Sequence, residues 1–289
     1  FDRTIAQAMG FDFDSGRLDV STHPFCLGFT PNDVRMTTRY NEKLVGQSLF
    51  GVMHETGHAL YEQGLDPAHV GTPMGMFCSL GIHESQSRMW ENQVGRSRPF
   101  WEHFFPKLQQ AFPSFQNVAL DDWHFAINVV RPSCIRVEAD EVTYGLHIML
   151  RFDIEREMLD GRLAVADVPE AWNARMEQML GVRPPNDAQG CLQDVHWSMG
   201  IFGYFPTYQL GNLYAAQIAV AARQALPDLD AQLARGELLP LREWLRENVH
   251  RQGRRYSGPE LVKLVTGKAL SHRPFVEYLR AKYQPLYGF

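Results

Sequence analysis

Residues 49–64, LFGVMHETGHALYEQG, combine a helical repeat of apolar side chains with a pair of histidines. The apolar side chains recur at steps of three and four residues, which is the spacing of one helix face: Leu49, Phe50, Met53, Leu60 and Tyr61. Gly64, a residue type that commonly ends helices, closes the repeat. The stretch therefore predicts a helix that carries its polar residues near its centre.

The remainder of the chain shows more helical signals and few strand signals. A long apolar-periodic stretch covers residues 135–159, and a further helix is expected between Asp167 and Gly181. Residues 210–226 are rich in Ala, Gln and Leu, whereas only residues 33–40, DVRMTTRY, alternate as a strand does. The sequence predicts a mainly α protein with a small antiparallel β-sheet.

Aromatic residues at helical spacing indicate part of the core. Trp101, Phe104 and Phe105 lie three and four residues apart, which places them on one helix face. We expect these side chains to be buried rather than to bind a ligand.

Composition and charge exclude several classes of protein. The 289 residues contain 28 Lys and Arg against 33 Asp and Glu, a net charge of -5, and this mild acidity disfavours nucleic-acid binding. No run approaches the roughly 18 apolar residues of a membrane helix. The first residues lack the basic and then apolar pattern of a secretory signal. We expect a globular protein with no nucleic-acid or membrane partner.

The four cysteines, Cys26, Cys78, Cys134 and Cys191, stand far apart and form no CxxC pair. A chain of this length does not need a disulfide framework, and a cysteine zinc site would require paired spacing. We therefore expect free thiols in a cytoplasmic protein.

An HExxH motif lies at the centre of the first helix, His54-Glu55-Thr56-Gly57-His58. Histidines four residues apart lie one helical turn above each other, so both can reach one Zn²⁺ at about 2.0–2.1 Å. Glu55 lies beside them and can take the proton of a metal-activated water. The motif predicts a metal site with Glu55 as its base.

A third ligand must come from elsewhere, because catalytic zinc takes three protein ligands and keeps one position open. Position 64 is Gly64, so the extended motif with a third histidine is absent. The candidates are the carboxylates of Glu62, Glu84 and Glu91. Glu62 lies one turn further on the same helix and cannot easily bend back, whereas Glu84 lies in residues 82–88, where a second helix is expected. The spacing leaves open whether Glu84 is a ligand or a solvated glutamate in a first helical turn.

Five motifs in chain order resemble those of the thermostable metallocarboxypeptidase family, also called the carboxypeptidase Taq family. They are DxRxT at residues 33–37, HExxH at 54–58, HESQ at 83–86, IRxxAD at 135–140 and GxxQDxHW at 190–197. The resemblance implies a helical gluzincin catalytic region akin to neurolysin and the angiotensin-converting enzymes. It also implies a zinc carboxypeptidase of broad specificity, with cobalt as the other possible metal, and usually a homodimer.

The resemblance implies roles for individual residues of the metal site. His54, His58 and Glu84 are expected to hold one metal ion per chain, with Glu55 as the general base. His83, the first residue of HESQ, either contacts substrate or only starts its helix.

The resemblance also points to Arg136 as the group that holds the carboxylate of the substrate's C-terminus, ahead of Arg35, since arginine binds carboxylates bidentately. The residues alone allow simpler interpretations. Arg136 can pair with Asp140 one helical turn on, at the start of a long helix, and Arg35 can pair with Asp33 on a strand face.

His196, Tyr204 and Tyr208 follow the GxxQDxHW match. A neutral His or Tyr can donate to a developing oxyanion, and in the related neurolysin-like enzymes a His and a later Tyr do so. The spacing does not choose between the two tyrosines, and packing remains an alternative for each. Asp194 is expected to orient His196 or a metal ligand.

Members of that family have chains of about 500 residues, which is longer than a single ordinary domain. We therefore expect residues 1–289 to form a single catalytic domain, the C-terminal part of a longer chain whose N-terminal helical region is absent. The expected partners are peptide substrates, a second copy of the chain and that N-terminal region. An endopeptidase or dipeptidase of the same HExxH…E class and a non-catalytic zinc-stabilised scaffold remain alternatives.

Overall fold

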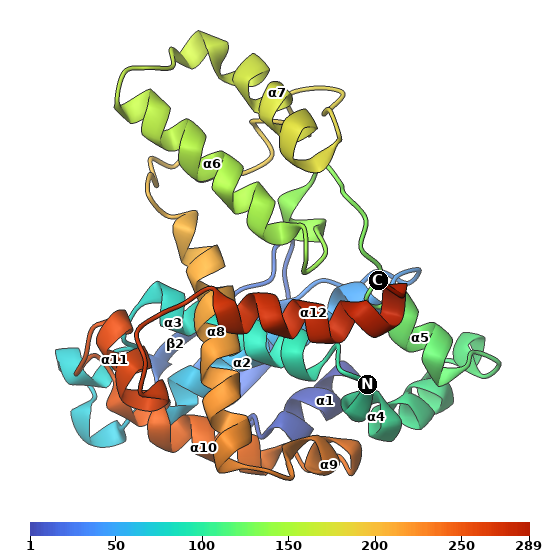
Figure 1. Cartoon of the computed structure of the whole chain (residues 1–289). Helices are drawn as coiled ribbons and strands as arrows, with labels where there is room; N and C mark the ends of the chain where they lie inside the picture. The colour runs from blue at the N-terminus through green and yellow to red at the C-terminus, as the bar shows by residue number, and fades with distance from the viewer. The chain divides into compact units, whose positions relative to one another are not determined.

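The computed structural model describes residues 1–289, which form a mainly helical protein (Figure 1). The residues group into two compact units: residues 1–127 with 210–289, and residues 128–209. The helices of the first unit are α1 (Asp2–Met9), α2 (Val45–Gly64), α3 (Leu80–Arg88), α4 (Arg98–Ala111), α5 (Leu120–Ala126), α9 (Leu229–Ala234), α10 (Leu239–Asn248), α11 (Gly258–Thr266) and α12 (Arg273–Tyr287). The second unit contains α6 (Tyr144–Leu159) and α7 (Val168–Leu180), and α8 (Pro206–Ala225) begins in the second unit and continues in the first. The mainly α prediction is confirmed, while the single catalytic domain stays a prediction.

The strands form one small sheet in the first unit: β1 (Gly16–Val20), β2 (Cys26–Thr30) and β3 (Asp33–Thr38). β3 lies in the middle, antiparallel to β2 and parallel to β1. The prediction of an antiparallel sheet is therefore wrong, because the sheet is mixed. The chain reverses after β1 and again after β2, so β3 runs in the direction of β1 when it fills the place between them.

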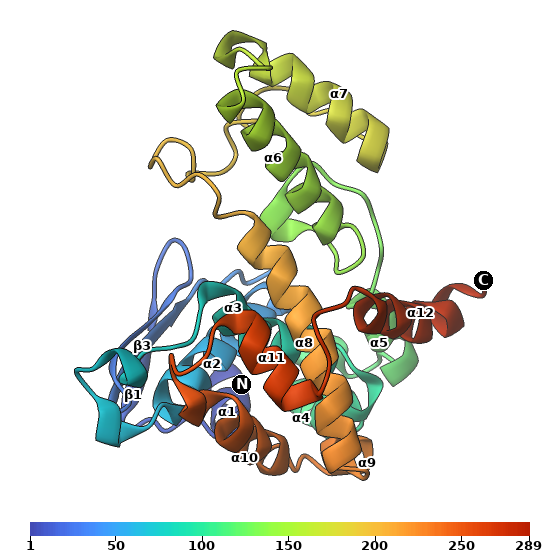
Figure 2. The same cartoon turned by 60° about the vertical axis from the view of Figure 1, so that its left-hand side comes forward.

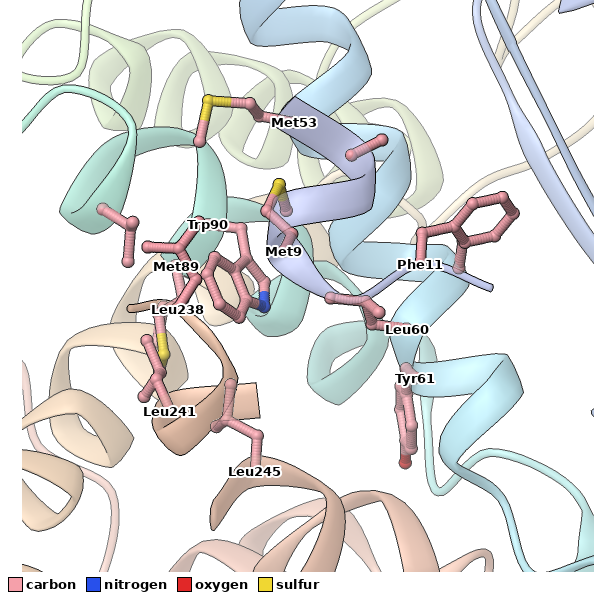
Figure 3. Packing of buried hydrophobic residues seen from close by; sticks show 14 of the residues in the cluster. Met9, Phe11, Met53, Leu60, Tyr61, Met89, Trp90, Leu238, Leu241 and Leu245 are labelled. Atoms are coloured by element: carbon pink, nitrogen blue, oxygen red, sulfur yellow. The ribbon is translucent and has the colours of Figure 1, made fainter. Parts of the chain in front are cut away.

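Helix α2 is central to the first unit, and most of its apolar side chains are at most 2% exposed: Leu49, Val52, Met53, Leu60 and Tyr61. Figure 3 shows Met53, Leu60 and Tyr61 in one cluster with side chains of α1, α10 and the π-helix Met89–Val94 that follows α3. Strands β2 and β3 also pack against α2 (Figure 2). The helix ends at Gly64 as predicted, where a Cβ atom would lie 2.4 Å from Nδ1 of His250. A helix enclosed in this way is held mainly by packing rather than by intrinsic propensity.

Two further predictions from helical patterns are confirmed. Trp101, Phe104 and Phe105 of α4 are buried in the core. Helix α7 begins after Asp167 and ends at Gly181, whose φ of 68° lies in the left-handed region that favours glycine.

Helix α6 begins later than predicted. The apolar pattern of residues 135–159 predicts one long helix with Arg136 at its start, but Arg136 lies in a separate 3₁₀ turn, Arg136–Glu138. The carboxylate of Asp140 accepts hydrogen bonds from the backbone N–H and the hydroxyl of Thr143, at 2.9 and 2.8 Å. Such side-chain bonds stabilise a turn in competition with helix, so the helix starts only after Asp140.

All four cysteines are free, as predicted, and Cys78 and Cys191 are buried. No helix combines the length and the apolar character that crossing a membrane requires.

Candidate metal centre

Helices α2 and α3 approach closely because of a glycine. Gly57 stands between the two histidines of α2, and a Cβ atom there would lie 2.6 Å from Cα of Ser87 and 2.7 Å from the carbonyl oxygen of Gln86. These separations leave no room for a side chain, so glycine lets the two helix backbones meet. The contact brings Glu84 of α3 next to both histidines.

His54, His58 and Glu84 each offer one ligand atom, and these atoms all lie within 4.8 Å of one another. Oε2 of Glu84 lies 3.8 Å from Nε2 of His54 and 3.5 Å from Nε2 of His58. Two ligands of a tetrahedral zinc ion at about 2.1 Å are roughly 3.4 Å apart, so this donor set fits a zinc ion with small adjustments. Glu84 is buried, which contradicts the alternative of a solvated glutamate.

Each histidine of the pair has a hydrogen bond on its Nδ1 atom. Nδ1 of His54 lies 2.9 Å from Oε2 of Glu91, which also accepts from Nη1 of Arg88 at 3.0 Å. Nδ1 of His58 lies 2.5 Å from Nδ1 of His83. Because a carboxylate only accepts hydrogen bonds, His54 carries a proton on Nδ1, and the neutral form of its ring therefore has its lone pair on Nε2, the atom that a metal ion would bind.

Glu55 lies on α2 beside the ligands and is buried. Burial raises the pKa of its carboxyl group to about 7, and the negative charges of Glu84 and Glu91 contribute to the rise against the opposing effect of His54. A carboxyl group that titrates near neutral pH can both accept and release a proton there. Glu55 is therefore a buried carboxyl group beside the three grouped ligands, where the sequence places it.

His83 and Glu62 lie next to the ligand set. Nε2 of His83 lies 2.9 Å from Oε1 of Glu62, so both ring nitrogens of His83 have protein partners. Glu62 is not one of the three grouped ligands, in agreement with the sequence argument that it cannot bend back.

Arg35 is exposed on β3 and forms an ion pair with Asp33 at 2.8 Å. This is the strand-face pairing that the sequence left open.

In the second unit, Arg136 is buried and held by Asp194 rather than by Asp140. Nε and Nη2 of Arg136 lie 3.0 and 2.7 Å from Oδ1 of Asp194, and Nη1 donates to the hydroxyl of Tyr144 at 3.1 Å. Although burial opposes it, the nearby Tyr144 and Asp194 hold the pKa of Arg136 above its ordinary value. Arg136 is therefore a cation fixed in one orientation.

A second guanidinium group shares the same carboxylate. Nε of Arg151 donates to Oδ2 of Asp194 at 2.7 Å, and the side chain of Arg151 is fully buried. Two guanidinium groups therefore share one carboxylate, and these charge-assisted bonds hold all three side chains in place.

The hydroxyl of Tyr208 lies 3.0 Å from Nε2 of His196, and the Tyr204 ring lies 5.3 Å from the His196 ring. Oδ1 of Asp194 is 4.0 Å from Nδ1 of His196, which is too long for a hydrogen bond. The structure thus brings His196 and both tyrosines together, while Asp194 binds the two arginines.

Two residues of these networks were not predicted in their present roles. Glu91 was considered as a ligand but is the partner of His54. It follows Glu84 by two helical turns, and this spacing could have indicated a shared face. Arg151 has no local signal, because it lies within the apolar pattern of α6.

A family model described as "Carboxypeptidase Taq (M32) metallopeptidase" matches residues 1–283. Thermostable carboxypeptidase 1 of Thermus thermophilus is 52% identical over 284 residues, which cover 98% of this chain and 56% of that protein. Carboxypeptidase 1 of Bacillus subtilis is 48% identical, with 97% of this chain and 56% of that protein covered. The chain therefore spans about half the length of the curated relatives it matches.

Solved structures agree with this likeness. The M32 carboxypeptidase from Deinococcus radiodurans has a TM-score of 0.97 and 48% identity, covering 100% of this chain and 58% of that chain. A carboxypeptidase from Pyrococcus furiosus has a TM-score of 0.95 and 43% identity, covering 98% of this chain and 57% of that chain.

Proposed function

The chain belongs to the carboxypeptidase Taq (M32) metallopeptidase family. On this basis we propose that it carries the metal site of a zinc-dependent carboxypeptidase of broad specificity. The proposal is supported above all by the three grouped side chains of His54, His58 and Glu84 with the buried Glu55 beside them. Structural zinc sites are usually closed by four protein ligands, whereas three ligands leave a position for a reactant.

A divalent cation held by these ligands supplies a Lewis acid, which makes a water molecule more acidic and polarises the peptide carbonyl. Glu55 accepts the proton of that water on its carboxylate and passes it to the leaving amine. His196 and Tyr208 are the proposed hydrogen-bond donors to the developing oxyanion, and the neighbouring Tyr204 is the alternative donor.

Arg136 is the proposed anchor for the terminal carboxylate of the substrate. Its buried position and its bond to Asp194 support this role, because an anchor must stay charged and must not move. Arg35 is the second candidate, but its charge is exposed and already paired with Asp33.

Two substrates test the proposal. The zinc-loaded protein should hydrolyse an N-blocked peptide with a free C-terminal carboxylate and release single C-terminal amino acids. It should act far more slowly on the C-amidated form of the same peptide. Equal rates on both would favour the endopeptidase alternative, and full zinc occupancy without hydrolysis of either would favour the non-catalytic scaffold.

Three further features belong to the same proposal. The proposed metal is zinc rather than cobalt. The proposed assembly is a homodimer, and the proposed location is the cytoplasm. The likeness to neurolysin and the angiotensin-converting enzymes also stays a prediction. Metal analysis of protein purified without added metal, and sedimentation of that protein, address the first two.

A further inference from the structure

The two histidine ligands differ in what supports them. His54 is bonded directly to a carboxylate, that of Glu91. His58 is bonded to a second imidazole, and the carboxylate of Glu62 lies beyond it, at 2.9 Å from Nε2 of His83. His58 and Glu62 lie one turn apart on α2, so His83 of α3 lies bonded between two residues of the other helix.

The order of donors and acceptors along this chain of bonds follows from the carboxylate at its end. The Glu62 carboxylate can only accept, so Nε2 of His83 carries a proton and donates. A neutral His83 then accepts on Nδ1, and Nδ1 of His58 is the donor of the 2.5 Å bond. This arrangement leaves the Nε2 lone pair of His58 directed at the ligand set, where it lies 3.5 Å from Oε2 of Glu84.

Neighbouring residues pack around the side chains of His83 and Glu62 and limit how far these side chains can move. The His83 ring is in contact with the rings of Tyr61 and Phe77, with centroids 5.1 and 4.8 Å away. Strand β2 lies against the Glu62 carboxylate, because a Cβ atom on Gly28 would be 2.4 Å from Oε2 of Glu62. The side chains of His83 and Glu62 are each only 12% exposed. Both groups are therefore packed in place.

We propose that Glu62, acting through His83, positions the metal ligand His58 and sets which of its nitrogens is free for the metal, and that His83 does not contact substrate. The inference rests on the proposed function only in taking His54, His58 and Glu84 as the ligands. Partners of this kind typically change metal affinity by about 10–100-fold when they are removed. A relay in series adds a stricter expectation: once His83 is removed, the identity of residue 62 should no longer affect the metal.

The test measures zinc affinity by competition with a chromophoric chelator. Glu62→Gln, which keeps the shape of the side chain, and His83→Leu should each raise the Kd for zinc by about 10–100-fold. The double variant should match His83→Leu within about twofold, since the two residues act in one chain of bonds. Glu102→Gln on α4, an exposed glutamate, is the matched control and should leave the Kd unchanged. Thermal unfolding of the metal-free variants reports any general loss of stability separately.

Two results would overturn the inference: an unchanged Kd in Glu62→Gln, or losses that add in the double variant. A raised KM for peptide in His83→Leu at saturating zinc, with the Kd for zinc unchanged, would instead assign His83 to substrate binding. Because zinc affinity is measured without peptide, the absence of peptidase activity in the parent protein would count against the proposed function and not against this inference.

Discussion

Glu55 provides the most direct test at the scale of single residues. Glu55→Gln removes the proton acceptor but keeps the shape of a side chain that does not belong to the three grouped ligands. The variant should bind zinc as the parent does and should lose activity by about 10²–10⁴-fold, the usual contribution of general-base catalysis. Zinc content and kcat measured on the same preparation test this. Full activity at full zinc occupancy would remove Glu55 from the mechanism.

Arg136 allows a second test at this scale. Arg136→Ala should lower kcat/KM on free-acid peptides by roughly 10–100-fold, because a hydrogen bond to a charged group contributes about 1.5–3 kcal/mol. The loss on C-amidated peptides should be much smaller, since they lack the carboxylate. Arg35→Ala is the matched control and should have little effect on either substrate. The same fractional loss on both substrates would mean that Arg136 supports the fold of the second unit instead.

At the scale of elements, the contact between α2 and α3 depends on one glycine. Gly57→Ala would place a methyl group against backbone atoms of α3, at 2.6 and 2.7 Å, and backbone cannot move aside as a flexible side chain can. We expect a loss of about 1–3 kcal/mol in the free energy of unfolding. We also expect zinc affinity to fall by about tenfold or more, because the ligands come from both helices.

Gly51 on the same helix is the control for this substitution. A Cβ atom there would meet only Oγ1 of Thr38, at 3.9 Å. Gly51→Ala should therefore raise the free energy of unfolding by about 0.5–1 kcal/mol through helix propensity, with zinc affinity unchanged. Chemical denaturation and the chelator assay measure both effects, and equal behaviour of the two variants would contradict the packing argument.

The boundaries of the helices show where a local sequence pattern predicts an element correctly and where it does not. Helix α7 ends where the sequence predicts because Gly181 adopts a left-handed φ of 68°. Helix α2 also ends at the predicted Gly64, but there a side chain would collide with His250, which is a tertiary constraint. The start of α6 differs from the prediction. Apolar residues continue at helical spacing before and after Asp140, but the hydrogen bonds of the Asp140 carboxylate to Thr143 favour a turn there instead of a helix.

At the scale of the whole molecule, buried neutral histidines make folding sensitive to acid. Burial lowers the pKa of His147 to about 3, helped by the charges of Arg151 and Arg136, and burial lowers that of His250 to about 3 as well. An unfolded histidine has a pKa of about 6.5, so between about pH 6.5 and 3 the unfolded chain binds more protons than the folded one. Stability should therefore fall as the pH decreases through this range, by up to about 1.4 kcal/mol per pH unit for each histidine.

His147→Leu isolates one of these contributions. Neither ring nitrogen of His147 has a hydrogen-bond partner, so the substitution leaves no other group unpaired. The free energy of unfolding should become less dependent on pH between about pH 6 and 4, by about 1 kcal/mol per unit, and should be unchanged or higher at neutral pH. Denaturation curves at several pH values measure this, with the exposed His272→Gln as control. An unchanged pH dependence would show that His147 is not the source.

Features that depend on residues close together along the chain could be predicted from the amino-acid sequence. His54 and His58 share a face of α2 because four residues make about one helical turn. The buried aromatic face of α4 follows from the same short-range periodicity, and the end of α7 follows from the local preference of Gly181 for a left-handed φ. The ordered motifs indicated the family and, through it, the choice of Glu84.

Features that depend on contacts between distant segments could not be predicted in this way. Gly57 brings α3 against α2 and thereby buries Glu84 beside the histidines. The pairing of Arg136 with Asp194 joins residues 58 positions apart, and the parallel pairing of β1 with β3 depends on which strand fills the centre of the sheet. A buried charge needs a partner, but local sequence does not say which of several carboxylates will be near it, because that depends on how the elements pack.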